Sequence, residues 1–325
     1  MYTKTTFNIG YKNLYWRWFF ILLVDLLKEF KFDMQIKNFS DRTIKTATNS
    51  TKAFFAYSNK EFNVNELEEI THLHIKKYIS YMQGLGRTES YINSILKYLR
   101  MFFRYCIQEE YITEKQNPTI KVKWAKETKV IIETFTDAEV KKMLKQWDFN
   151  KFYNARNKAI IATFFETGIR NLELCNLNIT DVRERVILVH GKGNKERYVP
   201  ISPILKKILI KYERIRQGYI KNKFLEDDAY FLSKNGKRLT VETVERVVKI
   251  TGENAKVRKN IRCSPHTCRH YFAQFMLSKA KLDVYTVSRL LGHENLTITK
   301  RYLQSLKDKQ IVDMSTNASP LMILK

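Results

Sequence analysis

Apolar residues recur with a helical period through most of the first third of the chain. Ile75, Ile79 and Met82 stand at positions i, i+4 and i+7, a spacing that places side chains on one helix face. A longer stripe follows and consists of Ile92, Ile95, Leu96, Leu99, Phe103 and Cys106. Gly84 and Gly86 lie between the two stripes and predict a turn. Residues 34–116 are therefore predicted to form a small helical domain.

The helical pattern stops near Pro118. Four lysines follow without an apolar stripe between them, namely Lys121, Lys123, Lys126 and Lys129. This composition is typical of an extended segment, so residues 117–133 are predicted to be a basic linker. A second lobe, residues 134–306, then begins with an amphipathic helix for which Thr136 is the expected N-cap.

The second lobe contains one clear β pattern. Residues 185–202 alternate β-branched and polar side chains on both sides of Gly191–Asn194, which predicts a β-hairpin. A shorter extended piece turns at Asn235 and Gly236, and the remainder of the lobe has helical periodicity. The predicted fold class is mainly α with a small β-hairpin sheet (α+β), arranged in two lobes.

The two ends of the chain stand outside these lobes. The uninterrupted apolar run from Trp18 to Val24 is far shorter than the ~20 residues that span a bilayer, and no small-residue cleavage site follows it. Residues 1–33 are an extension of unknown role, either an amphipathic helix or the product of an upstream start with Met34 as the true first residue. Residues 307–325 form a polar spacer and a short apolar tail.

Length and charge narrow the class of function. A chain of 325 residues suits two domains, and its 58 Lys and Arg against 33 Asp and Glu leave a net charge of +25. A strong positive electrostatic field gives no advantage to an enzyme that acts on a small neutral substrate, whereas it helps a protein that must neutralise phosphates. AT-rich coding sequence inflates the lysine count as well, but it does not explain where the arginines stand.

Eight cations of the first lobe and the linker are predicted to contact DNA: Lys76, Lys77, Arg87, Lys97, Arg100, Arg104, Lys121 and Lys123. Most of the cations on the predicted helices lie outside the apolar stripes and would be exposed. A row of exposed cations is more often a solvated helix face than a binding site, so this signal alone is weak. The four cysteines are scattered among apolar neighbours. Reduced thiols in a cytoplasmic protein fit this distribution best.

Arg170 is the first candidate for chemistry. In the stretch ETGIRNLELC a helix is expected to end at Thr167 and Gly168, so that Arg170 falls where the next helix begins. The helix dipole makes a cation mildly unfavourable at that point. The position is easier to understand if an anion joins Arg170 there.

The stretch SPHTCRHYFA contains a second group. Ser264 is a good N-cap and Pro265 a good first helical residue, so His266 and Arg269 fall on one face of the first turns. The free N–H groups of that helix start, the imidazole and the guanidinium predict a phosphate site. A zinc site is the alternative, since Cys263, His266, Cys268 and His270 crowd together, but the run lacks the usual two separated ligand pairs.

Two further stretches of the sequence contain the remaining candidates for chemistry. Lys192 lies at the predicted hairpin tip, in the run GKGNK, which is not a nucleotide-binding phosphate loop. The stretch DVYTVSRLLG reads as a helix that is stopped by Gly292 and leaves His293 at its exit. Tyr302 stands on the early turns of the next helix, for which Thr297 is a candidate cap.

Taken in order, these six positions resemble the tyrosine recombinases, also called phage-type integrases. TGIRNLEL is similar to their first arginine box and HGKGNKERYVP to their β-hairpin lysine. HTCRHYFA and LLGHENLTITKRY are similar to their second box. The resemblance covers about residues 34–306 and is closest to the Xer-type members. It implies a two-lobed DNA clamp with a helical core-binding domain and a catalytic domain.

The resemblance also implies a mechanism, with Arg170, Lys192, His266, Arg269, His293 and Tyr302 as catalytic residues. Tyr302 would attack a DNA phosphate and form a 3′-phosphotyrosyl bond, while Arg170 and Arg269 hold the non-bridging oxygens. His293 donates a hydrogen bond, Lys192 protonates the leaving 5′-oxygen, and His266 either assists the tyrosine proton or holds the phosphate. Because the exchange of one phosphodiester for another is nearly isoenergetic, ATP is not expected. The sequence has no acidic cluster suited to a two-metal site, so neither a metal nor any other cofactor is expected.

The same resemblance implies partners and leaves alternatives. The expected substrate is double-stranded DNA with an inverted-repeat core site, bound by a homotetramer or by a mixed assembly with a related recombinase. The apolar tail is a candidate for docking into a neighbouring subunit; the alternatives are that it folds back on its own lobe or stays disordered. A non-cutting DNA-binding protein of this fold and a type IB topoisomerase-like enzyme are the alternative functions.

Overall fold

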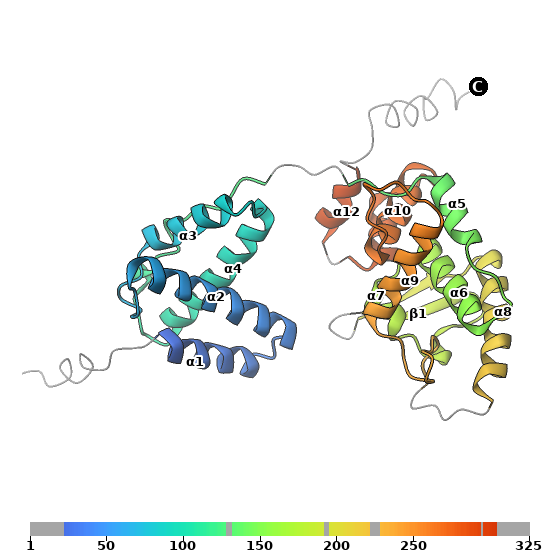
Figure 1. Ribbon diagram of the computed structural model, residues 1–325, viewed down its shortest axis with the longest axis horizontal. Coiled ribbons are helices and arrows are strands. Elements are labelled where there is room, and N and C mark those ends of the chain that lie inside the picture. The colour runs from blue at the N-terminus through green and yellow to red at the C-terminus, as the bar shows by residue number, and fades with distance from the viewer. Residues whose placement is uncertain (1–22, 128–131, 192–194, 222–227, 294, 304–325) are drawn as a thin grey trace, which may run out of the picture. The chain divides into compact units, whose positions relative to one another are not determined.

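The computed structural model describes residues 23–127, 132–191, 195–221, 228–293 and 295–303 (Figure 1). The chain divides into two compact units, residues 1–129 and 130–325. Within the described residues, mainly α-helices and one small antiparallel sheet are present, which confirms the predicted fold class. No helix in these ranges is both long enough and apolar enough to cross a membrane.

The N-terminal unit is a helical bundle. Its α-helices in the described ranges are α1 (Leu23–Ile36), α2 (Asp41–Phe62), α3 (His72–Gly84) and α4 (Glu89–Gln108). All six residues of the long predicted stripe on α4 are buried, whereas on α3 Tyr78 is buried and Ile79 only half-buried. The centre of the bundle is aromatic, since the Phe30 and Phe55 rings both pack edge-on against Phe102.

Helix α1 extends the N-terminal unit beyond the boundary predicted at residue 34. Leu26 and Phe30 are as fully buried as Met34, and all three belong to the core of the bundle. The helix packs against α2. A start at Met34 would remove this apolar face from the bundle, so the described part of the predicted extension is a structural element.

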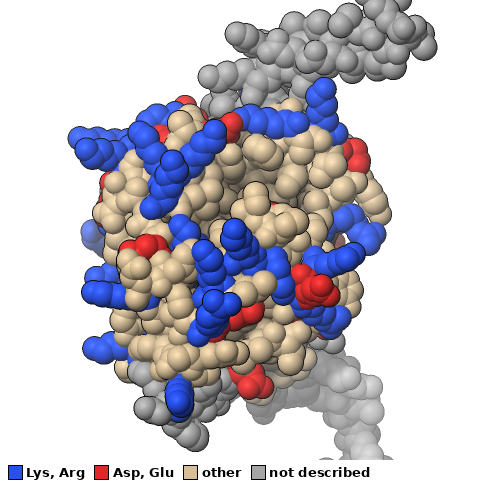
Figure 2. Space-filling view, turned by 90° about the vertical axis from the view of Figure 1, so that its right-hand side faces the viewer, with Lys and Arg blue, Asp and Glu red and all other residues tan. Residues whose placement is uncertain are grey.

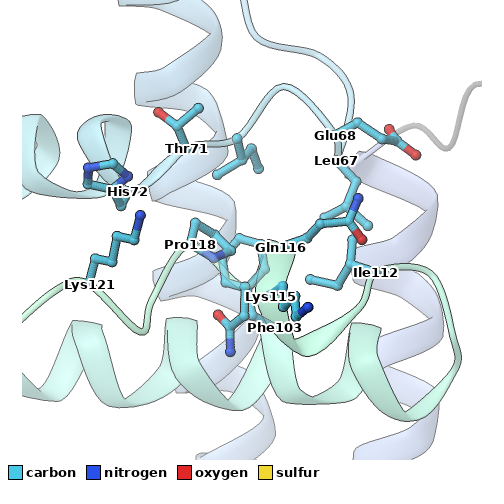
Figure 3. Close-up of a pocket in the computed structure, with 12 residues that line it drawn as sticks. Leu67, Glu68, Thr71, His72, Phe103, Ile112, Lys115, Gln116, Pro118 and Lys121 are labelled. Atoms are coloured by element: carbon cyan, nitrogen blue, oxygen red, sulfur yellow. The ribbon is translucent and has the colours of Figure 1, made fainter.

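Part of the predicted linker packs against α4. Val122 is buried in the core of the N-terminal unit, and Asn93 on α4 donates to the Ala125 carbonyl and accepts from the Ala125 amide. The same segment borders an open pocket at the start of α3, where Lys121 and His72 face each other across the opening (Figure 3). Up to Glu127, therefore, the segment is held by the bundle, and residues 128–131 lie outside the described ranges.

The C-terminal unit begins with the capped helix expected after Thr136. Thr136 accepts from the Glu139 amide and Glu139 bonds back to the Thr136 amide. The α-helices and strands of the unit are α5 (Asp137–Lys145), α6 (Phe152–Thr167), α7 (Asn171–Cys175), β1 (Val186–His190), β2 (Glu196–Pro200), α8 (Pro203–Ile220), α9 (Val241–Asn254), α10 (Pro265–Ser278), α11 (Val284–Leu291) and α12 (Leu296–Leu303).

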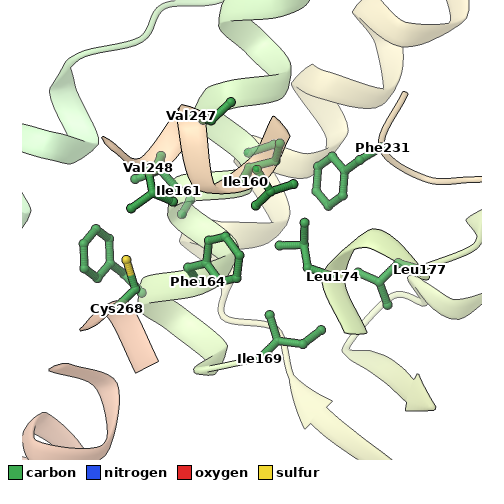
Figure 4. Packing of buried hydrophobic residues seen from close by; sticks show 14 of the residues in the cluster. Ile160, Ile161, Phe164, Ile169, Leu174, Leu177, Phe231, Val247, Val248 and Cys268 are labelled. Atoms are coloured by element: carbon green, nitrogen blue, oxygen red, sulfur yellow. The ribbon is translucent and has the colours of Figure 1, made fainter. Parts of the chain in front are cut away.

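Helix α6 forms the centre of the C-terminal unit. It is buried on nearly every side, including the polar residues Arg156 and Asn157, and it contacts α5, α8, α9 and α10. Figure 4 shows Ile160, Ile161 and Phe164 surrounded by Leu174 of α7 and Cys268 of α10, among others. The two helices that carry Arg170 and Arg269 are thus fixed to the same core.

The predicted hairpin is present. Strands β1 and β2 pair antiparallel, with Val189 opposite Arg197 and His190 opposite Glu196. The shorter turn at Asn235 and Gly236 forms only an isolated bridge between Leu232 and Arg238, with Gly236 at φ 77°. The four cysteines are free thiols.

Candidate active site

The first arginine lies where the sequence places it. Gly168 ends α6 in the left-handed region at φ 59°, and a side chain there would come within 2.5 Å of the Phe272 ring, so this sharp turn favours glycine. Arg170 then caps α7. Its guanidinium donates from Nη1 to Glu173 Oε1 (2.6 Å) and from Nη2 to the Gly292 carbonyl (2.8 Å). Glu173 therefore supplies an anion beside the cation at the helix start.

The second arginine is buried. Arg269 is only 3% exposed and donates from Nη1 to the Gly168 carbonyl and from Nη2 to the Leu291 carbonyl, both at 2.8 Å. Burial first, and then the neighbouring Arg170, lower the pKa of Arg269 to about 10, so the group remains charged at neutral pH. Because Leu291 and Gly292 are consecutive, the two guanidinium groups lie at the same end of α11.

A third arginine, which the sequence reasoning missed, completes this arrangement. Arg197 on β2 donates from Nε to the Leu290 carbonyl (2.9 Å) and forms a two-pronged pair with Glu173 at 2.9 and 2.7 Å. The last carbonyls of α11, at residues 290, 291 and 292, are thus each held by a different arginine. Gly292 fits closely here, since a side chain would come within 2.9 Å of Arg197. Cations at a helix C-terminus are favourable.

Glu173 links two of these arginines. Burial alone would raise the pKa of its carboxyl, but hydrogen bonds from Arg197 and Arg170 lower that pKa to about 2. The carboxylate is therefore ionised, and both of its oxygens accept hydrogen bonds from arginines. One signal in the sequence could have revealed it, because an acid three residues after an N-cap often bonds back to the cap, as Glu173 does to the Arg170 amide at 2.9 Å.

We expect the Glu173→Ala variant to be less stable by about 3 kcal/mol, because loss of a buried acid leaves its arginine partners without a counter-charge. The unfolding temperature of the C-terminal unit should fall by roughly 10 °C in calorimetry. Glu245→Ala, which removes an exposed acid of α9, is the control and should change little. An unchanged unfolding temperature for Glu173→Ala would contradict the role given to this pair.

The histidines and Tyr302 lie beside the arginines. α10 begins with Ser264 accepting from the Thr267 amide, and its first turns carry His266 at the surface and His270 half-buried, with ring centroids 4.3 Å apart. His270 Nδ1 is 3.0 Å from the Tyr302 hydroxyl. His293 Nδ1 is 2.8 Å from the Thr299 hydroxyl, and its ring lies parallel to that of Tyr302 at 6.3 Å.

These groups lie close enough together to shift one another's pKa values. Burial, followed by Arg269 and Arg170, lowers the pKa of both His266 and His293, the latter to about 3. Burial, followed by His266 and Arg269, lowers the pKa of His270 to about 4. A charge on Tyr302 would in turn raise the pKa of Arg269. Two permanent cations, three neutral imidazoles and a phenol are therefore gathered in one place.

Comparisons with known proteins agree with this geometry. A model described as the phage integrase family matches residues 133–309, and one described as a phage integrase N-terminal SAM-like domain matches residues 26–113. The chain is 32% identical to the tyrosine recombinase XerC of Thermodesulfovibrio yellowstonii, over 88% of this chain and 92% of that protein. The chain belongs to the phage integrase family of tyrosine recombinases.

Other relatives and solved structures of this family are similar along most of the recombinase. XerC of Bacillus pumilus is 32% identical over 84% of this chain and 88% of its own. The XerH site-specific recombinase bound to difH shares the fold with a TM-score of 0.71 at 23% identity, covering 91% of this chain and 84% of that chain. A lambda integrase dimer bound to a core site shares the fold with a TM-score of 0.69 at 19% identity. This match covers 88% of this chain and 78% of that chain.

The structure brings together five of the six predicted catalytic residues of the recombinase: Arg170, His266, Arg269, His293 and Tyr302. The sixth, Lys192, lies outside the described residues. The alternative zinc ligands diverge, because Cys268 packs in the hydrophobic core (Figure 4) and His270 contacts Tyr302. Within the ranges that the structure describes, no three His, Cys, Asp or Glu side chains are grouped so that they could hold a metal ion.

The predicted DNA contacts of the N-terminal unit are of two kinds. All except Arg100 are exposed. Arg100 is half-buried, donates to the Val122 carbonyl at 2.6 Å and stacks over the Trp124 ring at 4.2 Å, so it positions the segment after the bundle.

Figure 2 shows Lys and Arg spread widely over one face of the molecule. Positive charge by itself therefore does not locate the DNA.

Proposed function

We propose that this recombinase cuts and rejoins DNA strands through a covalent bond between Tyr302 and a 3′-phosphate of the DNA. The observation that carries the proposal is that Arg170, Arg269 and neutral histidines form one group beside Tyr302. The arginines are already fixed by the carbonyls of Gly168, Leu291 and Gly292. Charges that are in place before the reaction stabilise a developing anion most effectively.

The two arginines retain donors for a phosphate. An arginine side chain has five N–H donors, and the contacts described above engage one on Nη1 and one on Nη2 of both Arg170 and Arg269. The remaining N–H groups can bind the non-bridging oxygens of one phosphodiester. Planar guanidinium forks suit these oxygens in a way that a lysine ammonium does not. We therefore place the scissile phosphate at this pair.

His293 is suited to donate one further hydrogen bond. Its pKa of about 3 keeps the ring neutral. When the Thr299 hydroxyl donates to Nδ1, the ring proton resides on Nε2 and is available to a phosphate oxygen. His266 lies at the surface beside the same arginines, which supports its role in holding the phosphate over a role at the tyrosine proton.

In the proposed step the phenol oxygen of Tyr302 attacks the phosphorus and the 5′-oxygen of the DNA leaves. By family resemblance Lys192 gives this oxygen its proton. Tyr302 is 3% exposed, so we expect DNA binding to shift α12 and present the hydroxyl. A free 5′-hydroxyl from a partner strand then reverses the attack and rejoins the backbone.

The proposed substrate is double-stranded DNA with an inverted-repeat core site, bound by a homotetramer or a mixed assembly. Two observations on related structures support this: XerH is bound to a palindromic difH substrate and lambda integrase forms a tetramer on a Holliday junction. The exposed cations of α3 and α4 are proposed to bind the backbone of the same site. The apolar tail, a candidate for docking into a neighbouring subunit, lies outside the described residues.

The test uses nicked duplexes made from the DNA that flanks the recombinase's own gene. On such suicide substrates we expect a protein–DNA adduct that resists denaturant and forms equally well in EDTA, because no step of the proposal requires a metal. Binding without any adduct would instead support a non-cutting protein. Relaxation of supercoiled DNA without strand exchange between two sites would support a topoisomerase-like enzyme.

A further inference from the structure

His270 contacts the oxygen that is proposed to react, and no role has yet been given to this histidine. Its Nδ1 lies 3.0 Å from the Tyr302 hydroxyl, and the two ring centroids are 5.3 Å apart. This distance is that of a hydrogen bond. The contact joins α10 to α12 across 32 residues of sequence, so it depends on the tertiary fold.

The state of the His270 ring suits an acceptor. A protonated imidazole can only donate, whereas a neutral one has one accepting nitrogen. Burial is the largest cause that keeps the ring neutral, and it is followed by His266 and Arg269 on the same helix. On α10, the His270 ring faces the hydroxyl of Tyr302, which α12 carries. A neutral ring at this distance can receive the phenol proton directly.

The other two histidines are occupied elsewhere. His266 lies at the surface and packs edge-on against His270, and both Arg269 and Arg170 lower its pKa, so it lies near the proposed phosphate site. His293 has its Nδ1 at the Thr299 hydroxyl. Within the described site, His270 is thus the histidine placed at the oxygen that must lose a proton.

We propose that His270 is a catalytic residue that accepts the proton of Tyr302 as strand cleavage begins. The proposal rests on the function proposed above. A bond forms between the phenol oxygen and the phosphorus, and the bond from phosphorus to the 5′-oxygen breaks. The phenol proton passes to His270 Nδ1 to give an imidazolium, and the leaving oxygen takes a proton from the general acid. Rejoining returns both protons.

The position of Arg269 makes this transfer compatible with phosphate binding. Arg269 and His270 are consecutive on α10, and a charge on Tyr302 acts on Arg269, so the hydroxyl lies close to both. A hydroxyl that turns toward a phosphate held by Arg269 therefore stays near the His270 ring. The negative phosphodiester also stabilises an imidazolium, which makes His270 a stronger base once DNA is bound.

The decisive experiment follows single-turnover cleavage of a suicide duplex as a function of pH. For the parent recombinase the rate should rise with pH and level off, because the neutral ring is the active form. His270→Gln cannot take up the proton, so its plateau rate should fall at least about 100-fold and the rise attributed to His270 should vanish. His72→Gln, a histidine of the N-terminal unit, is the matched control and should keep the parent profile.

Two further measurements separate proton transfer from simple positioning. Added imidazole should restore part of the rate of His270→Ala and none of that of Tyr302→Phe. A substrate with a 5′-thiol leaving group should rescue Lys192→Ala and leave His270→Gln slow. Melting temperatures and DNA affinities of the variants should match those of the parent.

The proposal is overturned by a His270→Gln rate within about threefold of the parent. A slow variant that keeps the parent pH profile, or a His270→Ala variant that imidazole does not rescue, would overturn it as well, since either result indicates a structural role only. The function proposed above would survive any of these outcomes, provided that the parent chain forms the adduct and Tyr302→Phe does not.

Discussion

The Tyr302→Phe variant is expected to bind DNA as tightly as the parent chain and to form no covalent adduct with a suicide substrate. The ring of Tyr302 packs among Phe272, Leu277 and Leu291, and phenylalanine preserves this packing. The substitution removes the proposed attacking oxygen together with its contact with His270. Removal of a nucleophile reduces the rate by roughly 10⁴-fold or more, which places the residual adduct below detection on a denaturing gel.

A neighbouring tyrosine provides the matched control for this variant. The Tyr271 hydroxyl donates to Asp137, and burial followed by that carboxylate raises the pKa of Tyr271, so it is unsuited to attack. Tyr271→Phe should therefore form the adduct within a few-fold of the parent rate. Adduct formation by Tyr302→Phe at a comparable rate would show that the nucleophile has been misassigned.

Arg170→Lys is expected to slow cleavage at least about 100-fold although the positive charge is kept. The guanidinium of Arg170 reaches Glu173 with one nitrogen and the Gly292 carbonyl with another, and it has donors left for the phosphate. A single ammonium cannot span these positions. The measurement is the single-turnover cleavage rate at saturating protein, together with the DNA dissociation constant, which should change little.

The control for this substitution is Arg246→Lys, which changes an exposed arginine of α9 in the same way. We expect parent rates from it. Equal cleavage rates for Arg170→Lys and the parent chain would contradict the view that fork geometry, and not charge, is what the site requires at residue 170.

The positions of the proposed catalytic residues along the chain could be predicted because local signals fix them. Gly168 and Gly292 end helices in the left-handed conformation, and Ser264 with Pro265 starts α10. Each signal acts within one turn of helix, so its effect on the neighbouring Arg170, His266 or His293 follows from the sequence alone. The hairpin was predictable for the same reason, through its alternating pattern.

The contacts that bring these residues together join distant parts of the chain. They leave no signal in the sequence comparable to a helix cap or a turn. Arg197 and Glu173 are 24 residues apart, and Arg197 reaches the Leu290 carbonyl across 93 residues. His270 could be read as a zinc ligand because its neighbours in sequence are cysteine and histidine. In the structure Cys268 is drawn into the core by burial and His270 turns toward Tyr302, a divergence that spacing along one helix does not reveal.

The ends of the N-terminal unit were harder to predict because contacts between elements that are distant in sequence bury their residues. The segment after Pro118 is rich in lysine and reads as a free linker, yet Val122 is buried and Asn93 holds the backbone of Ala125. In the same way the apolar residues of α1 are buried by packing on α2 and on Phe102 of α4.

Chemical identification of the attached residue tests the central claim most directly. The covalent complex formed on a suicide duplex is digested with trypsin and nuclease, and the modified peptide is sequenced by mass spectrometry. We predict a nucleotide joined through its 3′-phosphate to the tyrosine of the peptide YLQSLK, residues 302–307. Attachment to any other of the 18 tyrosines, or to a different type of residue, would contradict the account.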